Sequence, residues 1–173
     1  GVFIAVHGLG AHSGRWEFFA ADAVARGYAV YAIELSGFGR TAGLRGHIDS
    51  FEDYYRDVTE VAARARGENA GAPVYVIGES MGGLIAYLMA VSPRFAFDGY
   101  LCLSPAFKSL FPYGPLDYLD FLVSYFLRGT RQYRMPFTSD MCTRDPGYRQ
   151  VMDAHAAENR VATARTIGTI FFA

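Results

Sequence analysis

Four short apolar runs occur in the first 107 residues, and segments with helical periodicity separate them. The runs are rich in Val, Ile, Tyr and Leu and do not alternate with polar residues, which is typical of strands buried on both faces. They are residues 2–6, 28–33, 74–77 and 100–103. The repeated order of strand and helix predicts an α/β fold, with a parallel sheet of four strands and helices on both faces.

The clearest helical pattern follows residue 50. Apolar residues recur at spacings of three and four over residues 51–65, while charged residues take the other side. Ser50 with Asp53 three residues later resembles a capping box, and Gly67 is expected to end the helix. The other two predicted helices in this half are residues 16–26 and 81–91.

The character of the chain changes after residue 107. Aromatic residues and prolines become frequent, residues 116–127 are apolar with helical spacing, and residues 148–171 have room for one or two more helices. No strand is expected in this half. The sequence therefore predicts a partial α/β core at residues 1–107 and a helical cap, or lid, at residues 108–173, with the rest of the core expected beyond the chain.

Composition and charge exclude several classes of function. The 16 basic and 17 acidic residues give a formal charge of -1, which offers no electrostatic attraction for nucleic acid. No apolar run reaches the roughly 18 residues that a membrane span requires. Cys102 and Cys142 form no disulfide or metal pattern, so we expect a reducing, cytoplasmic setting and no metal or cofactor.

Both ends of the sequence are predicted to be truncated. The chain opens with Gly1 directly before an apolar run, and it stops within an apolar stretch at Ala173. Neither a charged leader nor a cleavage site of the signal-peptide type is seen. A targeting signal therefore cannot be read from these first residues.

The most informative motif is a pentapeptide directly after the third predicted strand. Its sequence, Gly78-Glu79-Ser80-Met81-Gly82, fits the G-x-S-x-G pattern, and a predicted helix follows it. Such a sharp turn presents a serine hydroxyl at a helix N-terminus, and Gly78 and Gly82 avoid side-chain clashes there. Ser80 is therefore the candidate nucleophile. The alternative is a glycine-rich turn with an incidental serine.

A second motif, His7-Gly8-Leu9-Gly10, follows the first predicted strand. Acyl transfer requires two amide donors that stabilise the oxyanion, each worth about 3 kcal/mol when removed singly. The residue after the nucleophile, Met81, supplies one donor, and Leu9 in the H-G-x-G turn is the candidate for the other. Gly8 and Gly10 let the backbone approach the substrate. The alternative is a plain histidine at a strand end, followed by an ordinary turn.

Four separated motifs together resemble the monoacylglycerol lipase and lysophospholipase family of α/β-hydrolases. They are HGLGAHSGRW from His7, GFGRT from Gly37, RGHI from Arg45 and GESMGG from Gly78. The resemblance implies an α/β-hydrolase sheet in which the first apolar run lies between the second and the third, and the fourth lies beside the third. It also implies that Ser80 is the nucleophile, that Leu9 and Met81 are the oxyanion donors, and that a mobile helical cap covers an acyl-chain pocket.

The same family also implies an acid and a histidine, which follow further strands after the cap in the order Ser, Asp, His. The single histidine after Ser80 is His155, which is a poor candidate because it lies on an apparent helix rather than after a strand. The triad Asp and His are therefore expected outside this chain. Where relatives often have Asp after the second strand, this chain has Glu34. The residues expected to be structural or solvated are His12, His47, Asp140, Asp145 and Asp153.

The predicted function is a serine hydrolase that cleaves lipid-type carboxylic esters, of monoacylglycerol or lysophospholipid, through an acyl-enzyme on Ser80. Aromatic residues in the cap suit an acyl chain, since each buried methylene contributes about 0.8 kcal/mol. The expected partners are the lipid ester and a membrane surface that the cap contacts. The alternatives are an inactive, degenerate domain that serves as a binding module, an acyltransferase, and an esterase for small aromatic esters. The 173-residue chain alone is expected to be inactive, because it lacks the base.

Overall fold

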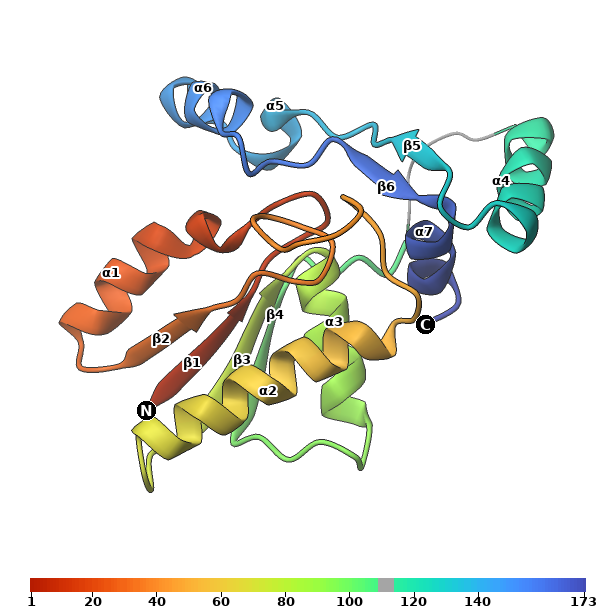
Figure 1. Cartoon of the computed structure of the whole chain (residues 1–173). Helices are drawn as coiled ribbons and strands as arrows, with labels where there is room; N and C mark the ends of the chain where they lie inside the picture. The colour runs from red at the N-terminus through yellow and green to blue at the C-terminus, as the bar shows by residue number, and fades with distance from the viewer. Residues whose placement is uncertain (109–113) are drawn as a thin grey trace.

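The computed structural model describes residues 1–108 and 114–173, and its core is a four-stranded parallel sheet (Figure 1). The strands are β1 (Val2–Val6), β2 (Ala29–Ala32), β3 (Val74–Glu79) and β4 (Gly99–Leu103). They lie in the order β2-β1-β3-β4, with Val2 opposite both Ala29 and Val74. The predicted strands, their parallel pairing and their order are confirmed.

Helices cover both faces of this sheet, as predicted. The 3-10 helix η1 (Ser13–Trp16) and α1 (Glu17–Ala25) pack on the face that carries Ala5 and Ile77. On the opposite face, α2 (Glu52–Glu68) and α3 (Met81–Val91) enclose the main core. Its most deeply buried side chains include Ile4, Val6, Tyr54, Val58, Val76 and Ile85. Alternate residues of each strand therefore point into two different cores.

The ends of α2 show which local signals decide a helix boundary. Asp53 Oδ2 accepts a hydrogen bond from the Ser50 amide at 3.0 Å, which is one of the two hydrogen bonds of the predicted capping box. Ser50 Oγ accepts from the Glu52 amide at 3.3 Å instead of from the Asp53 amide. The helix does not end at Gly67 as predicted. It continues to Glu68, because the Asn69 side chain donates to the Ala65 carbonyl at 2.9 Å and satisfies the last turn.

The second half of the chain contains strands as well as helices, so the prediction of no strand there is wrong. The antiparallel pair β5 (Gln132–Arg134) and β6 (Val161–Thr163) holds Tyr133 opposite Ala162. Each strand has only three residues, which is too short to show a periodicity in sequence. The helices are α4 (Pro115–Leu127), α5 (Ser139–Cys142), α6 (Pro146–Ala154) and α7 (Ala164–Phe171). Helices α4, α6 and α7 agree with the predicted helical segments, whereas the four-residue α5 lies outside them.

The elements after α4 lie over the end of the sheet at which the strand arrows point, as Figure 1 shows. Backbone hydrogen bonds join the two parts, from Asn159 to the Gly10 carbonyl and from Thr163 to the Gly46 carbonyl, each at 2.8 Å. Residues 109–113, at the start of the predicted cap, lie outside the described residues, and the proposed boundary at residues 107 and 108 stays a prediction. None of the described helices is long and apolar enough to cross a membrane.

Candidate active site

Ser80 occupies a strained turn between β3 and α3. Its backbone has φ 55° and ψ -115°, a region that residues with a side chain seldom adopt. Three hydrogen bonds hold this conformation: the Ser80 amide donates to the Leu103 carbonyl at 2.9 Å, and the Ser80 carbonyl accepts from Leu84 and Ala106. The surrounding backbone therefore fixes the direction of the Ser80 side chain.

Glycines on either side make the turn sterically feasible. A Cβ atom at Gly78 would overlap the carbonyl of Gly82, and a Cβ atom at Gly82 would overlap the carbonyl of Val6. Both neighbours are backbone atoms, which cannot move aside as a flexible side chain would. The steric reason predicted for these two glycines therefore agrees with the structure.

His7 lies directly beside the turn and is fully buried. Its Nε2 accepts a hydrogen bond from the Leu35 amide at 3.1 Å, so the proton is on Nδ1, which donates to the Gly8 carbonyl at 2.8 Å. Burial lowers the pKa of His7 from 6.5 to about 4, so the ring is neutral at pH 7. His7 is thus a neutral bridge between the loop after β1 and the loop after β2.

This bridge orients the next peptide group. The Gly8 carbonyl and the Leu9 N–H belong to one trans peptide group, in which they point in opposite directions. Because the Gly8 carbonyl is hydrogen-bonded to His7, the Leu9 N–H points away from His7. A Cβ atom at Gly8 would lie 3.2 Å from Ser80 Cβ and 3.7 Å from Ser80 Oγ, so this loop packs against the serine. Within residues 1–108 and 114–173, neither the Leu9 amide nor the Met81 amide has an acceptor.

A cavity lies between this loop, Ser80 and the second half of the chain. Ser80 is half-buried, and it lines the cavity together with Gly8, Leu9 and Gly10. The second half contributes apolar and polar lining, represented by Met135, Phe137, Met152, Glu158 and Asn159. The structure therefore brings the candidate nucleophile and the H-G-x-G loop to one cavity. An ester carbonyl that reached Ser80 there would lie beside the loop that carries the Leu9 amide.

His155 does not join this arrangement. It ends α6, and its ring stacks on His12 with a centroid separation of 4.0 Å. In the described part of the chain, no histidine hydrogen-bonds to Ser80, and no group of three or more His, Cys, Asp or Glu residues is arranged to hold a metal ion.

The other predicted structural residues connect or cap segments. His12 accepts from the Gly14 amide at 3.1 Å, and His47 Nδ1 lies 2.9 Å from Thr163 Oγ1. Asp145 caps α6, and Asp153 accepts a hydrogen bond from Ser139 at 2.9 Å and pairs with Arg160. Asp140 is exposed.

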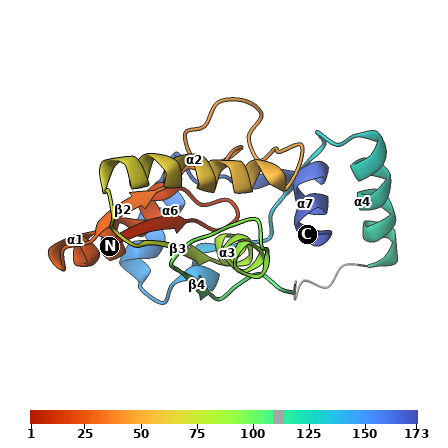
Figure 2. The same cartoon turned by 90° about the horizontal axis from the view of Figure 1, so that it is seen from below.

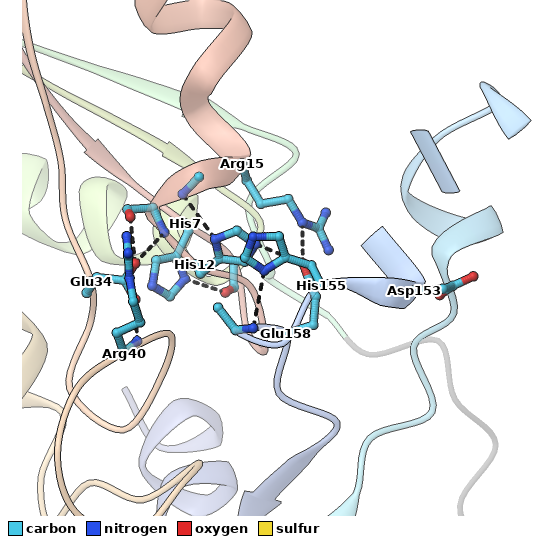
Figure 3. Close-up of polar contacts among 12 residues, drawn as sticks. His7, His12, Arg15, Glu34, Arg40, Asp153, His155 and Glu158 are labelled. Carbon is cyan, nitrogen blue, oxygen red and sulfur yellow. Dashed lines mark hydrogen bonds and ion pairs between the residues drawn. The ribbon is translucent and has the colours of Figure 1, made fainter. Parts of the chain in front are cut away.

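Sequence reasoning missed the role of Glu34, which it noted only as a departure from relatives. The Glu34 carboxylate accepts hydrogen bonds from Ser13 Oγ at 2.5 Å and from the Arg40 amide at 2.9 Å (Figure 3). Burial alone raises the pKa of Glu34, but hydrogen bonds from Ser13 and Arg40 lower it overall. Glu34 therefore joins the loops after β1 and β2 as a carboxylate. Its place directly after the apolar run at residues 28–33 is the signal that could have identified it.

Comparison with known proteins gives a consistent set of relatives. A family model described as serine aminopeptidase, S33, matches residues 1–171. The chain is 36% identical over 104 residues to a monoglyceride lipase homolog of monkeypox virus, covering 60% of this chain and 37% of that protein. It is 35% identical over 99 residues to the human monoglyceride lipase, covering 57% of this chain and 33% of that protein. These matches span about a third of the length of the curated relatives.

A solved structure shares the fold over almost the whole chain. It is a soluble variant of monoglyceride lipase from Saccharomyces cerevisiae, in complex with a substrate analog. Its TM-score is 0.83 at 18% sequence identity, with 99% of this chain and 58% of that chain covered. The likeness shows an α/β-hydrolase fold, of which this chain contains a part.

Proposed function

This chain belongs to the family described as serine aminopeptidase, S33, and from that premise we propose that the protein is a serine hydrolase of lipid-type carboxylic esters. The observation that carries the proposal is the strained Ser80 turn, which faces a cavity shared with the H-G-x-G loop. Relatives named monoglyceride lipase favour an ester of the monoacylglycerol type over an amide.

In the proposed reaction, Ser80 Oγ attacks the ester carbonyl and forms an acyl-enzyme as the alcohol leaves. The Leu9 and Met81 amides, which have no acceptor among the described residues, stabilise the oxyanion. Water then hydrolyses the acyl-enzyme. We propose that the Asp and His of the triad come from sequence outside residues 1–173, since His155 stacks on His12 instead.

A lipid substrate is supported by apolar side chains in the cavity and, separately, on the exposed face of α4. Leu9, Met135 and Met152 line the cavity. In Figures 1 and 2, α4 lies at one side of the molecule, next to α7. Apolar side chains of α4 face solvent, and they are Leu116, Leu119, Leu122, Val123, Phe126 and Leu127. We propose that this exposed face of α4 contacts a membrane surface, from which the substrate is taken.

A fluorophosphonate probe tests the nucleophile in the full-length protein. The probe should label Ser80, and Ser80→Ala should abolish labelling and lower kcat for monoacylglycerol by at least about 10⁴-fold. Ser92→Ala is the matched control, because Ser92 lies at the other end of α3, and it should leave both unchanged. Labelling that survives Ser80→Ala, or faster cleavage of peptide amides than of esters, would contradict the proposal.

A further inference from the structure

A short segment of the second half of the chain crosses the loop that carries Leu9. Residues 155–160, here called the strap, join α6 to β6. The Asn159 amide donates to the Gly10 carbonyl at 2.8 Å, and Gly10 has a positive φ of 81°. A Cβ atom at Gly10 would lie 2.6 Å from the Asn159 carbonyl oxygen, so the strap packs directly against the backbone of Gly10.

A partly buried ion pair fastens the strap to η1, which directly follows the same loop. Arg15 Nε donates to Glu158 Oε1 at 2.6 Å, and the two side chains are only 15% and 9% exposed. His12 Nε2 lies 3.6 Å from the same carboxylate oxygen, and the His12 ring stacks on His155. Figure 3 shows these four side chains gathered between the loop after β1 and the strap. Because water has little access to the Arg15–Glu158 pair, it is screened much less than a surface pair.

Leu9 therefore lies between two fixed carbonyl groups. The core fixes the Gly8 carbonyl through His7, whereas the strap fixes the Gly10 carbonyl through Asn159. Glu158 directly precedes Asn159, so the ion pair with Arg15 holds the strap next to the Asn159 amide, together with the hydrogen bonds from Arg45 to the carbonyls of Ala157 and Glu158. A contact between residues that are 143 positions apart in sequence thus lies beside the segment that carries the Leu9 amide.

We propose that Arg15 and Glu158 form a positioning pair, which holds the Leu9 amide toward the oxyanion by fastening the strap to η1, so that Asn159 stays on Gly10 of the preceding loop. This inference rests on the proposed esterase function, which it extends to two residues outside the nucleophile turn. The pair acts on the oxyanion donor through the backbone, so its loss lowers kcat for every ester, whatever its alcohol.

The competing role is direct contact with the substrate alcohol, because Arg15 and Glu158 also line the cavity. The two roles differ in the kinetic parameter that they affect. A contact with the alcohol raises KM for glycerol esters and leaves 4-nitrophenyl esters unaffected. A positioning pair lowers kcat for both ester classes and changes KM little.

The experiment compares kcat and KM in the full-length protein for Arg15→Met, Glu158→Gln and the double variant, on monoacylglycerol and on a 4-nitrophenyl ester. We expect kcat to fall about 10- to 100-fold in each single variant, since losing one oxyanion donor entirely costs about 10²–10³-fold. KM should stay within about threefold. The double variant should be no worse than either single variant, because both remove the same interaction. Arg15→Lys, which keeps the charge, should recover part of kcat.

Asp120→Asn is the matched control, because Asp120 pairs with Arg131 at the same distance of 2.6 Å but on the exposed surface. It should leave kcat unchanged. Unchanged kcat in Arg15→Met and Glu158→Gln, or a rise in KM alone, would overturn the proposal.

Amide hydrogen exchange of residues 8–11 provides a readout that does not depend on activity. Exchange should become faster in both variants and stay unchanged in Asp120→Asn, while a cooperative thermal transition shows that each variant is folded. If Ser80→Ala retains esterase activity, the proposed function fails, and the exchange result still decides whether the pair holds the loop. Exchange rates in Arg15→Met and Glu158→Gln that match those of the wild type would refute the positioning role of the pair.

Discussion

Lowering the pH from 7.5 to 5.0 should destabilise the folded protein by about 2 kcal/mol through His7 alone. His7 is fully buried, and its Nε2 must stay unprotonated to accept the hydrogen bond from the Leu35 amide. Protonation would therefore place a charge in the core and remove an acceptor from a buried amide. Burial accordingly lowers the pKa of His7 to about 4 in the folded state.

The sign of the effect follows from the two states. The unfolded chain binds a proton at His7 below its ordinary pKa of 6.5, whereas the folded protein does so only near pH 4. Stability from neutral His7 is therefore complete above pH 6.5 and is lost as the pH falls from 6.5 toward 4. At pH 5.0 the gap to 6.5 is about 1.5 units, which at about 1.36 kcal/mol per unit gives about 2 kcal/mol.

Urea denaturation at pH 7.5 and pH 5.0, for the wild type and for His7→Gln, measures this contribution. The free energy of unfolding of the wild type should fall with pH by about 2 kcal/mol more than that of the variant. His12, whose pKa is also lowered, first by burial and then by His155, is present in both proteins, so its contribution cancels. An identical pH dependence in the two proteins would show that burial does not lower the pKa of His7, and would refute the neutral state assigned to the ring.

Two further tests address the packing of Gly82 against β1 and the proposed membrane contact of α4. Gly82→Ala should lower the free energy of unfolding by about 3 kcal/mol, and Tm by about 6–12 °C, because its Cβ would overlap the Val6 carbonyl. Gly67→Ala, in an open position on α2, should instead stabilise by about 0.5–1 kcal/mol, and a loss of stability comparable to that of Gly82→Ala would contradict the steric argument. Replacing both Leu119 and Phe126 by serine should weaken co-sedimentation with phosphatidylcholine–phosphatidylserine vesicles by at least about tenfold, since both side chains are more than half exposed. Equal binding by the variant would exclude α4 as the membrane contact.

Local patterns were sufficient to predict the sheet, its helices and the turn at Ser80. Each strand of the sheet contains a continuous apolar run, and α3 begins at Met81 and ends at Val91, as the sequence predicted. The turn could be located because a strand, a G-x-S-x-G motif and a helix follow one another without interruption. Such signals depend on neighbours in sequence, so the sequence by itself contains them.

Contacts between distant segments were decided only by the tertiary structure. Strands β5 and β6 have three residues each, and neither is stable until the other lies beside it. Arg15 and Glu158 lie 143 positions apart, and each alone has the sequence appearance of a solvated charge. The loop that carries Leu9 is likewise held by segments far from it in sequence, through the Leu35 amide at His7 and the Asn159 amide at Gly10. Burial and partner choice arise when the chain packs, and no local pattern encodes them.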